Sequence, residues 1–358
     1  GNGNGNEIEN GTILKGTITS DVTLAAGNTY KLSGEYIVEE GGTLHIEEGV
    51  KIIAVYDDIA DYILVKQGGK INAVGTPDKP IVMTSEKEEP GAWGGIHICG
   101  RAHTNAEGGK GSSEIGGAVY GGNDDADNSG TLQYIRLEYT GFAFDEEHEA
   151  NGISFYSVGN GTIVDHCQAY KGSDDGFEFF GGSVNVSNLV AVSCSDDSFD
   201  WTEGWNGKGT NLVAYQEAES TLGYDCDCLM ECDNNGSNNA ATPVAHPVLK
   251  NLILVGNGGS KQGIRLRAGT EVEIDNAKVC GKGQPLTVET ALTENALKNG
   301  TSKLTNITLT SELSSKEGIY THADFIAVTS NKVDANLSYS SFEDIRKECS
   351  WMNGSWVK

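Results

Sequence analysis

Two acid-rich decapeptides repeat along the chain, SDDGFEFFGG at 173–182 and SDDSFDWTEG at 195–204, and they are offset by 22 residues. When they are superposed, Asp174, Asp175 and Glu178 align with Asp196, Asp197 and Asp200, and Phe177 and Phe179 align with Phe199 and Trp201. Carboxylates gathered in this way can bind a hard cation such as Ca²⁺, share protons through raised pKa values, or hydrogen-bond the backbone of their own turns. The offset is typical of a solenoid, in which each repeat stacks on the next.

The same pattern can be followed through three further segments, NGISFYSVG at 151–159, LGYDCDC at 222–228 and QGIRLRAG at 262–269. A second series comes before short runs rich in valine, isoleucine and leucine. It carries asparagine at one recurring position: Asn188, Asn211, Asn251, Asn276 and Asn306. Stacked asparagines at a turn can hydrogen-bond to the equivalent residues above and below. We therefore expect an asparagine ladder along one corner of the solenoid.

Two short strand signals recur about every 22 to 25 residues, and no helical periodicity is long enough to supply crossover helices. These features predict an all-β fold, a single-stranded parallel β-helix. An N-terminal pair of segments, VEEGGTLHI at 38–46 and VKQGGKINA at 65–73, supports it. We expect a flexible tether over 1–11, the β-helix over 12–340, and a C-terminal cap over 341–358 that covers the open edge of the last coil.

Several segments are longer than a coil needs. The stretches 105–130 and 142–150 are expected to project as loops. The 40-residue interval between Asn211 and Asn251 leaves open whether it contains a loop or an extra coil. Residues 341–348 have helical character, and Ser341 is suited to cap that helix.

Side chains alternate along a strand, so the aligned segments assign residues to two faces. The inward face is expected to hold two columns: Ile153, Phe177, Phe199, Tyr224 and Ile264, and Phe155, Phe179, Trp201, Cys226 and Leu266. The outward face is expected to hold Ser154, Glu178, Asp200, Asp225 and Arg265, with Tyr156, Phe180, Thr202, Asp227 and Arg267 beside them. The outward face therefore combines carboxylates, aromatic rings and two arginines.

Glu178, Asp200 and Asp225 would form a column of like charges about 4.8 Å apart, which is destabilising unless something offsets the repulsion. Bound Ca²⁺, the nearby arginines, and raised carboxyl pKa values are three ways to offset it. The candidate metal ligands are Asp174, Asp175, Glu178, Asp196, Asp197, Asp200 and Asp225. The Asp-Asp pairs also have a second interpretation, in which they only shape turns.

Aromatic residues on the outward face suggest contacts with sugar rings. Tyr156, Phe180 and Trp205, together with Asp227, are the candidate residues for binding a polysaccharide or glycan. The alternative is that these rings pack beneath one of the projecting loops. The sequence leaves both interpretations open.

Composition limits the partners. The chain has 358 residues with 51 acidic and 25 basic side chains, and its net charge is −26. A protein that neutralises phosphates needs the opposite balance, so neither nucleic acid nor an anionic membrane surface is an expected partner. No apolar run is long enough for a membrane helix. The opening GNGNGNEIENG has two interpretations, the remainder of an exported lipid-anchored protein and an ordinary flexible terminus.

Other chemistry has little support in the sequence. Cys226, Cys228 and Cys232 lack the paired spacing of common zinc sites, so a disulfide or buried thiols are expected. His166 falls at the recurring asparagine position, which favours a turn role. No nucleophile elbow, phosphate-binding loop or dinucleotide fingerprint appears, so hydride and phosphoryl transfer are not supported.

Several motifs carry a family resemblance: GGTLHIEEGVKIIA, GTPDKPIVMTS, PGAWGGIHICGRA, GTLQYIRLEYTG and the SDDGFEFFGG block. Together they resemble exported right-handed parallel β-helix lipoproteins of Gram-negative bacteria over residues 20–280. That family has no assigned reaction. The resemblance implies export, to the outer membrane or cell surface as a lipoprotein or to the periplasm. It also implies a distant relation to the pectate-lyase-like superfamily, whose enzymes act on acidic polysaccharides along an outer face.

Three functions follow as hypotheses. The first is a cell-surface protein that binds polysaccharide or glycan on the acidic and aromatic face, with Ca²⁺ as a possible cofactor. The second is a calcium-dependent polysaccharide lyase in which Arg265 or Arg267 is the base. Neighbouring carboxylates would raise the pKa of such an arginine, which opposes catalysis. The third is a structural or adhesive module without ligand chemistry.

Overall fold

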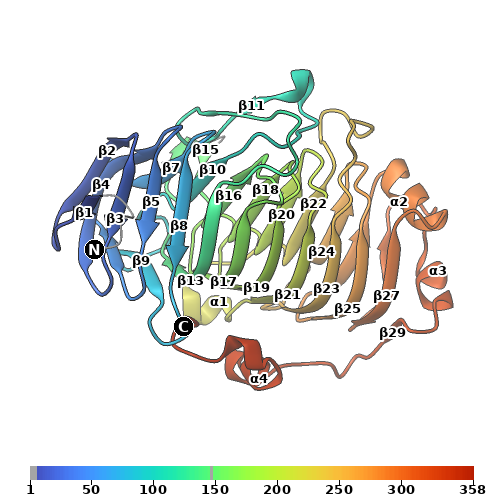
Figure 1. Ribbon diagram of the computed structural model, residues 1–358. Coiled ribbons are helices and arrows are strands. Elements are labelled where there is room, and N and C mark those ends of the chain that lie inside the picture. Colours follow the sequence, from blue (N-terminus) through green and yellow to red (C-terminus); the bar gives the residue numbers. More distant parts are fainter. Residues whose placement is uncertain (1–5, 146–147) are drawn as a thin grey trace.

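The computed structural model describes residues 6–145 and 148–358, and these residues form a long solenoid of parallel strands (Figure 1). One 25-stranded sheet winds through the described residues, and equivalent strands of successive coils pair in parallel. The predicted all-β parallel β-helix is therefore confirmed. No helix in the described part of the chain is long and apolar enough to cross a membrane.

One row of strands carries the repeated decapeptides. Its members are β7 (Tyr62–Val65), β10 (Ile96–Cys99), β16 (Ile153–Tyr156), β18 (Phe177–Phe180), β20 (Phe199–Thr202), β22 (Met230–Asp233), β24 (Gln262–Arg267), β26 (Gln284–Val288) and β28 (Ser314–Ser315). Each pairs with the next in register. This row positions the candidate site.

A second row carries the asparagines. It consists of β13 (Gly130–Glu138), β17 (Ile163–Tyr170), β19 (Asn185–Val192), β21 (Lys208–Tyr215), β23 (Val248–Val255), β25 (Glu273–Cys280), β27 (Lys303–Leu309) and β29 (Lys332–Val333). In the N-terminal coils its place is taken by separate strands: β1 (Asn6–Ile8), β3 (Asp21–Leu24), β5 (Thr43–Ile46), β6 (Lys51–Ala54), β8 (Lys70–Val74), β9 (Ile81–Ser85) and the first halves of β2 (Ile13–Ile18) and β4 (Thr29–Val38). The second half of β4 pairs with β7 and so continues the first row. The predicted pairing of 38–46 with 65–73 is confirmed, because Thr43 aligns with Lys70.

The asparagine ladder forms from Asn188 to Asn276, whereas the Asn306 amide donates to Asp275 instead. Each of the five asparagines has a left-handed backbone, with φ between 54° and 65°, and bends its strand around the corner of the coil. Asparagine tolerates this conformation better than most residues. The amide of Asn211 donates to Asn188 at 2.9 Å and accepts from Asn251 at 3.1 Å. His166 occupies the same position with φ of 53°, in the turn role expected for it.

The interior is one continuous core along the solenoid. Phe177 stacks on Phe199 with ring centroids 5.6 Å apart, and Phe155 stacks on Phe179 at 5.0 Å. These stacks confirm the predicted inward columns over β16, β18 and β20. All eight cysteines are buried and free, so buried thiols rather than a disulfide are present.

The predicted register is wrong at the fourth segment. Phe199 aligns with Met230 rather than with Tyr224, and Met230 aligns with Ile264. Leu222 instead ends a short helix, α1 (Glu219–Leu222), and residues 223–228 form the turn that leads into β22. Asn251 bonds directly to Asn211, so the 40-residue interval holds loops and no extra coil. The register prediction failed here because the segments LGYDCDC and LMECD show the same alternation of inward-type and outward-type residues.

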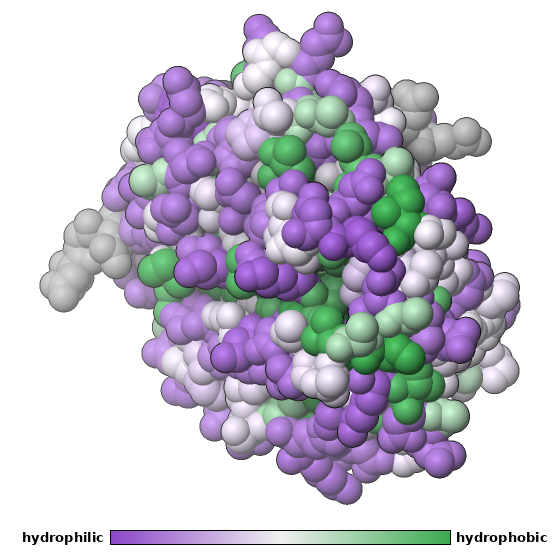
Figure 2. Space-filling view, turned by 90° about the vertical axis from the view of Figure 1, so that its right-hand side faces the viewer, coloured by the Kyte–Doolittle hydropathy of each residue, from purple (hydrophilic) through white to green (hydrophobic). Residues whose placement is uncertain are grey.

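The expected domain boundaries also change. Within the predicted tether, Asn6–Ile8 is strand β1, which pairs with β3, while residues 1–5 lie outside the described residues. The last coil is covered by α2 (Ala291–Lys298) and α3 (His322–Ala327), whose Leu297 and Phe325 join the core. Figure 2 shows this end, where apolar side chains lie among hydrophilic ones; Leu292, Ile326 and Val328 are exposed there.

The segment 341–358 is not a cap over the last coil. Its helix α4 (Phe342–Glu348) begins at Ser341 as predicted, and the Ser341 hydroxyl accepts a bond from the Asp344 amide at 3.3 Å. The segment then runs back along the flank of the solenoid through η2 (Ser350–Met352), as Figure 1 shows. Ile345, Met352 and Trp356 pack against valines of the second row. We call residues 341–358 the C-terminal tail.

Replacing Asn211 tests the ladder. Asn211→Gly removes two side-chain hydrogen bonds, each worth about 0.5 to 1.5 kcal/mol, but keeps the left-handed backbone. Asn211→Ala also places a Cβ in that conformation, which adds roughly 1 to 2 kcal/mol. We expect urea unfolding midpoints to fall in the order wild type, Gly, Ala. The exposed Asn206→Ala is the control and should not shift the midpoint. An alanine variant at position 211 as stable as the glycine variant would contradict the strained-corner interpretation.

Candidate acidic site

The turns that precede β18 and β20 bring the two Asp-Asp pairs together on the outer side of the first row. Within the strands, Glu178 aligns with Asp200, and Asp200 aligns with Glu231. The predicted column of like charges therefore exists, but its third member is Glu231. Asp225 lies outside the column, where it forms an exposed ion pair with Lys261 at 3.2 Å. Asp225 is therefore removed from the candidate metal ligands of this cluster.

The second aspartate of each pair shapes its turn. The Asp175 carboxylate accepts a bond from the Asp197 amide at 3.0 Å, and the Asp197 carboxylate accepts one from the Cys228 amide at 3.0 Å. In the preceding coil the Asn151 side chain does the same for the Asp175 amide at 3.3 Å. The turn-shaping interpretation is thus correct for these two aspartates. An amide can fill the position, as Asn151 shows, so the backbone bond alone does not explain the carboxylates.

The remaining carboxylate oxygens face one another. Three sets of side chains bring possible ligand atoms within 4.8 Å of each other: Asp174, Asp175 and Asp196; Asp175, Asp197 and Asp200; and Asp197, Asp227 and Cys228. The first two sets consist only of carboxylates and share Asp175. We call Asp174, Asp175, Glu178, Asp196, Asp197 and Asp200 the acidic cluster. Hard oxygen donors at this density suit Ca²⁺, which takes six to eight oxygen ligands.

Burial and mutual repulsion hold protons on this cluster. Burial, with the charges of Glu178 and Asp196, raises the pKa of Asp174 to about 10. Burial, with the charge of Glu114, raises the pKa of Glu178 to about 8. The pKa values of Asp175, Asp197 and Asp200 also lie well above their usual range, first because of burial and then because of neighbouring carboxylates. At neutral pH the cluster therefore needs protons or a cation to neutralise it.

Both arginines are engaged by carboxylates. Arg265 donates to Glu289 at 3.1 Å. Arg267 donates to Asp233 at 2.7 Å and pairs with Glu231. Burial lowers the pKa of Arg267, but Asp233 and Glu231 outweigh it and hold that pKa above its usual value. Arg267 therefore stays protonated and is not suited to act as a base.

The expected aromatic ligand face is not exposed. Tyr156 is 1% exposed and Phe180 is 6% exposed, because the projecting loop covers both. The hairpin β11 (Gly111–Ser112) and β12 (Val119–Tyr120) forms the centre of that loop. Tyr120 packs on Tyr156 with ring centroids 4.9 Å apart, and its hydroxyl donates to Glu203 at 2.9 Å. The packing alternative is correct for these rings.

Trp205 is also buried, but within the core, where it stacks on Phe179 with ring centroids 4.0 Å apart. It is therefore not available to a sugar. Asp227 is partly exposed beside the cluster, as one member of the third ligand set. Of the second loop, β14 (Ala143–Asp145) and β15 (His148–Glu149) pair, and residues 146 and 147 lie outside the described residues.

Sequence reasoning missed three acidic residues of this region. Glu231 and Asp233 follow the in-out alternation of LMECD, which was the available signal for them. Glu114 lies on the projecting loop, and burial raises its pKa to about 7. Its approach to Glu178 follows from how the loop folds back, for which no local pattern exists.

Asp200→Asn tests the charge state. A folded-state pKa above the unfolded value means that the folded protein binds more protons, so this group's contribution to stability declines as pH rises above about 4. In chelator at pH 8, we expect the variant to melt a few degrees above wild type. The gap should shrink at pH 5, where the wild-type group is protonated when folded. The exposed Asp78→Asn is the control. An equal gap at both pH values, or none at pH 8, would contradict the raised pKa.

Comparison with known proteins assigns the chain to a family. A family model described as a pectate-lyase-like beta helix domain matches residues 16–357. No curated protein and no solved structure matches the chain. The family model covers almost all of the solenoid and the tail, in agreement with the architecture described above. The chain therefore belongs to the pectate-lyase-like β-helix domain family.

Proposed function

We propose that this protein binds Ca²⁺ in the acidic cluster and, through the ion, a glycan that lies along the outer side of β18, β20 and β22. The observation that carries the proposal is the two carboxylate sets that share Asp175. Within the described residues, no member of the acidic cluster forms an ion pair with lysine, arginine or histidine. A divalent cation would replace the protons that otherwise neutralise the cluster.

The partial exposure of two cluster members supports a ligand on the ion. Asp175 and Asp197 are buried, whereas Asp196 and Asp200 are partly exposed, so an ion among them would face solvent on one side. Sugar hydroxyls or a uronate carboxylate could complete its coordination, because Ca²⁺ accepts oxygen ligands in flexible geometry. A bridging cation would also let an acidic polysaccharide approach a protein with a net charge of −26.

The family gives limited support. Members of one fold host unrelated functions, so the match supports a polysaccharide ligand only in general terms. Calcium sites of extracellular modules work at about 0.1 to 1 mM, a concentration typical outside cells. We therefore include export in the proposal, with a lipid anchor as the link to a membrane. The state of Arg267 does not favour a lyase, and we do not propose catalysis.

The first test is thermal unfolding at pH 7.5 in millimolar calcium and in chelator. A ligand that binds only the folded state stabilises it by mass action, so calcium should raise the melting temperature by several degrees. Asp197→Asn should abolish the rise while keeping the backbone bond to Cys228, since asparagine fills the equivalent place at position 151. Asp78→Asn is the matched control and should retain the full rise. Equal melting temperatures in calcium and chelator would overturn the calcium site.

The second test is affinity electrophoresis through gels that contain pectate, alginate or a neutral glucan. We expect calcium-dependent retardation by at least one polymer, and its loss in Asp197→Asn. Ultraviolet absorbance from unsaturated uronate would instead reveal a lyase. Neither retardation nor absorbance with any polymer, in a protein that binds calcium, would leave the ion as a structural element and overturn glycan binding.

A further inference from the structure

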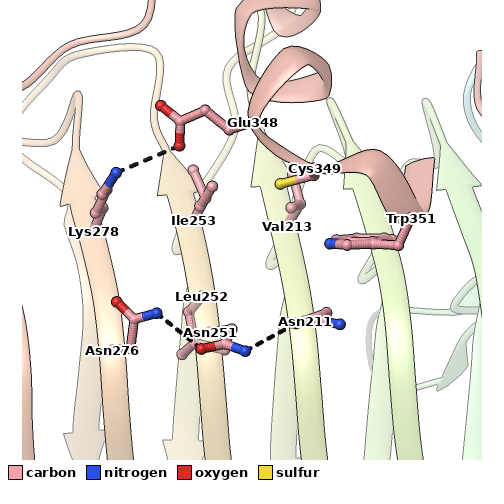
Figure 3. Close-up of a pocket in the computed structure, with 10 residues that line it drawn as sticks. All are labelled: Asn211, Val213, Asn251, Leu252, Ile253, Asn276, Lys278, Glu348, Cys349 and Trp351. Carbon is pink, nitrogen blue, oxygen red and sulfur yellow. Dashed lines mark hydrogen bonds and ion pairs between the residues drawn. The ribbon is translucent and has the colours of Figure 1, made fainter. Parts of the chain in front are cut away.

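A separate cleft of about 350 Å³ lies between the C-terminal tail and the outer side of β21, β23 and β25 (Figure 3). It belongs to the second row of strands, whereas the acidic cluster belongs to the first. The size falls within the range of small-molecule pockets. Its lining combines an amide ladder, aliphatic side chains, an indole and one ion pair.

The amides of Asn211, Asn251 and Asn276 line one side of the cleft. Each donates one amide hydrogen to the preceding ladder member, at 2.8 to 3.1 Å. A primary amide has a second hydrogen and two acceptor lone pairs, so each retains hydrogen-bonding capacity. The ladder also breaks at Asn276, because Asn306 donates to Asp275 instead, at 2.7 Å. The cleft thus offers donors and acceptors at intervals of about 4.8 Å.

The other walls are apolar or electrically balanced. Val213 and Ile253 project from the strands beside the amides, and Trp351 reaches in from the tail with its indole nitrogen facing the cleft (Figure 3). Lys278 and Glu348 close the far side and pair with each other at 3.4 Å. Among the described residues, Lys278 and Glu348 are the two charged side chains that line the cleft, and they neutralise each other in a protein that is otherwise strongly acidic.

We propose that this cleft binds a short neutral saccharide. The face of a pyranose ring is apolar and packs on an indole or on aliphatic side chains, while its hydroxyls need amide partners around the edge. Both kinds of surface are present here, and the absence of net charge selects neither anions nor cations. The proposal does not rest on calcium or on the acidic cluster.

The test is saturation-transfer NMR in chelator with glucose, galactose, mannose, xylose, N-acetylglucosamine and cellobiose as probes. We expect transfer to at least one of them. Trp351→Ala should weaken binding by about tenfold or more, the loss usual for a buried aromatic contact, while Trp351→Phe retains part of it. Lys347→Ala, on the adjacent helix α4 of the same tail but outside the cleft, is the matched control.

A second variant changes the strand side of the cleft and leaves the tail intact, so that weaker binding does not result from detachment of the tail. Asn276→Gly removes an exposed amide and its hydrogen bond to Asn251 but keeps the left-handed backbone. We expect it to weaken binding several-fold, while the melting temperature falls only slightly, as the loss of a single hydrogen bond predicts. Asp197→Asn should bind the sugar as wild type does, which separates this site from the proposed calcium site. No transfer to any probe, or transfer that persists in both Trp351→Ala and Asn276→Gly, would overturn the proposal.

Discussion

The in-register parallel pairing of successive coils is the constraint on which the rest of the structure depends. Every residue on a strand has as its neighbour the equivalent residue of the next coil, about 4.8 Å away. The pairing of Phe177 with Phe199 and of Glu178 with Asp200 is a direct consequence. The same rule stacks rings on rings in the core, amides on amides at the corner, and carboxylates on carboxylates outside. It is favourable in the first two cases and unfavourable in the third.

The carboxylates of the acidic cluster are therefore held more firmly together than the same carboxylates would be on an irregular surface. A loop could turn its carboxylates apart, but Glu178 and Asp200 lie on strands that ladder hydrogen bonds hold in register. The Asp175 and Asp197 side chains are fixed further because they hold the amides of the next coil. The charge is consequently preorganised, and a cation would not need to draw the ligands together. At the far end of the column the chain uses Arg265 and Arg267 as its own counter-charges.

Much of the fold could be predicted because particular residue types recur at fixed positions of each coil. Asparagine at a fixed phase marks a corner that few residues tolerate, and paired phenylalanines mark the core. The register failed where two candidate segments, LGYDCDC and LMECD, alternate equally well, since alternation alone cannot choose between them. The site was predicted only in part. Tyr156 does point outward, but whether an outward residue is exposed depends on where a distant loop packs, and no local pattern encodes that.

The C-terminal tail changes how the solenoid is expected to unfold. A solenoid is quasi-one-dimensional, because each coil contacts only its neighbours, and it can fray from either end. Here Trp356 donates to the Pro77 carbonyl at 3.2 Å, and the Lys358 amide donates to Gln168 at 2.8 Å. The end of the tail thus binds one coil near the beginning of the solenoid and another near its middle. The tail therefore connects distant coils of the stack. It can dock only after the intervening coils have assembled. Once docked, it makes the unfolding of these coils more cooperative.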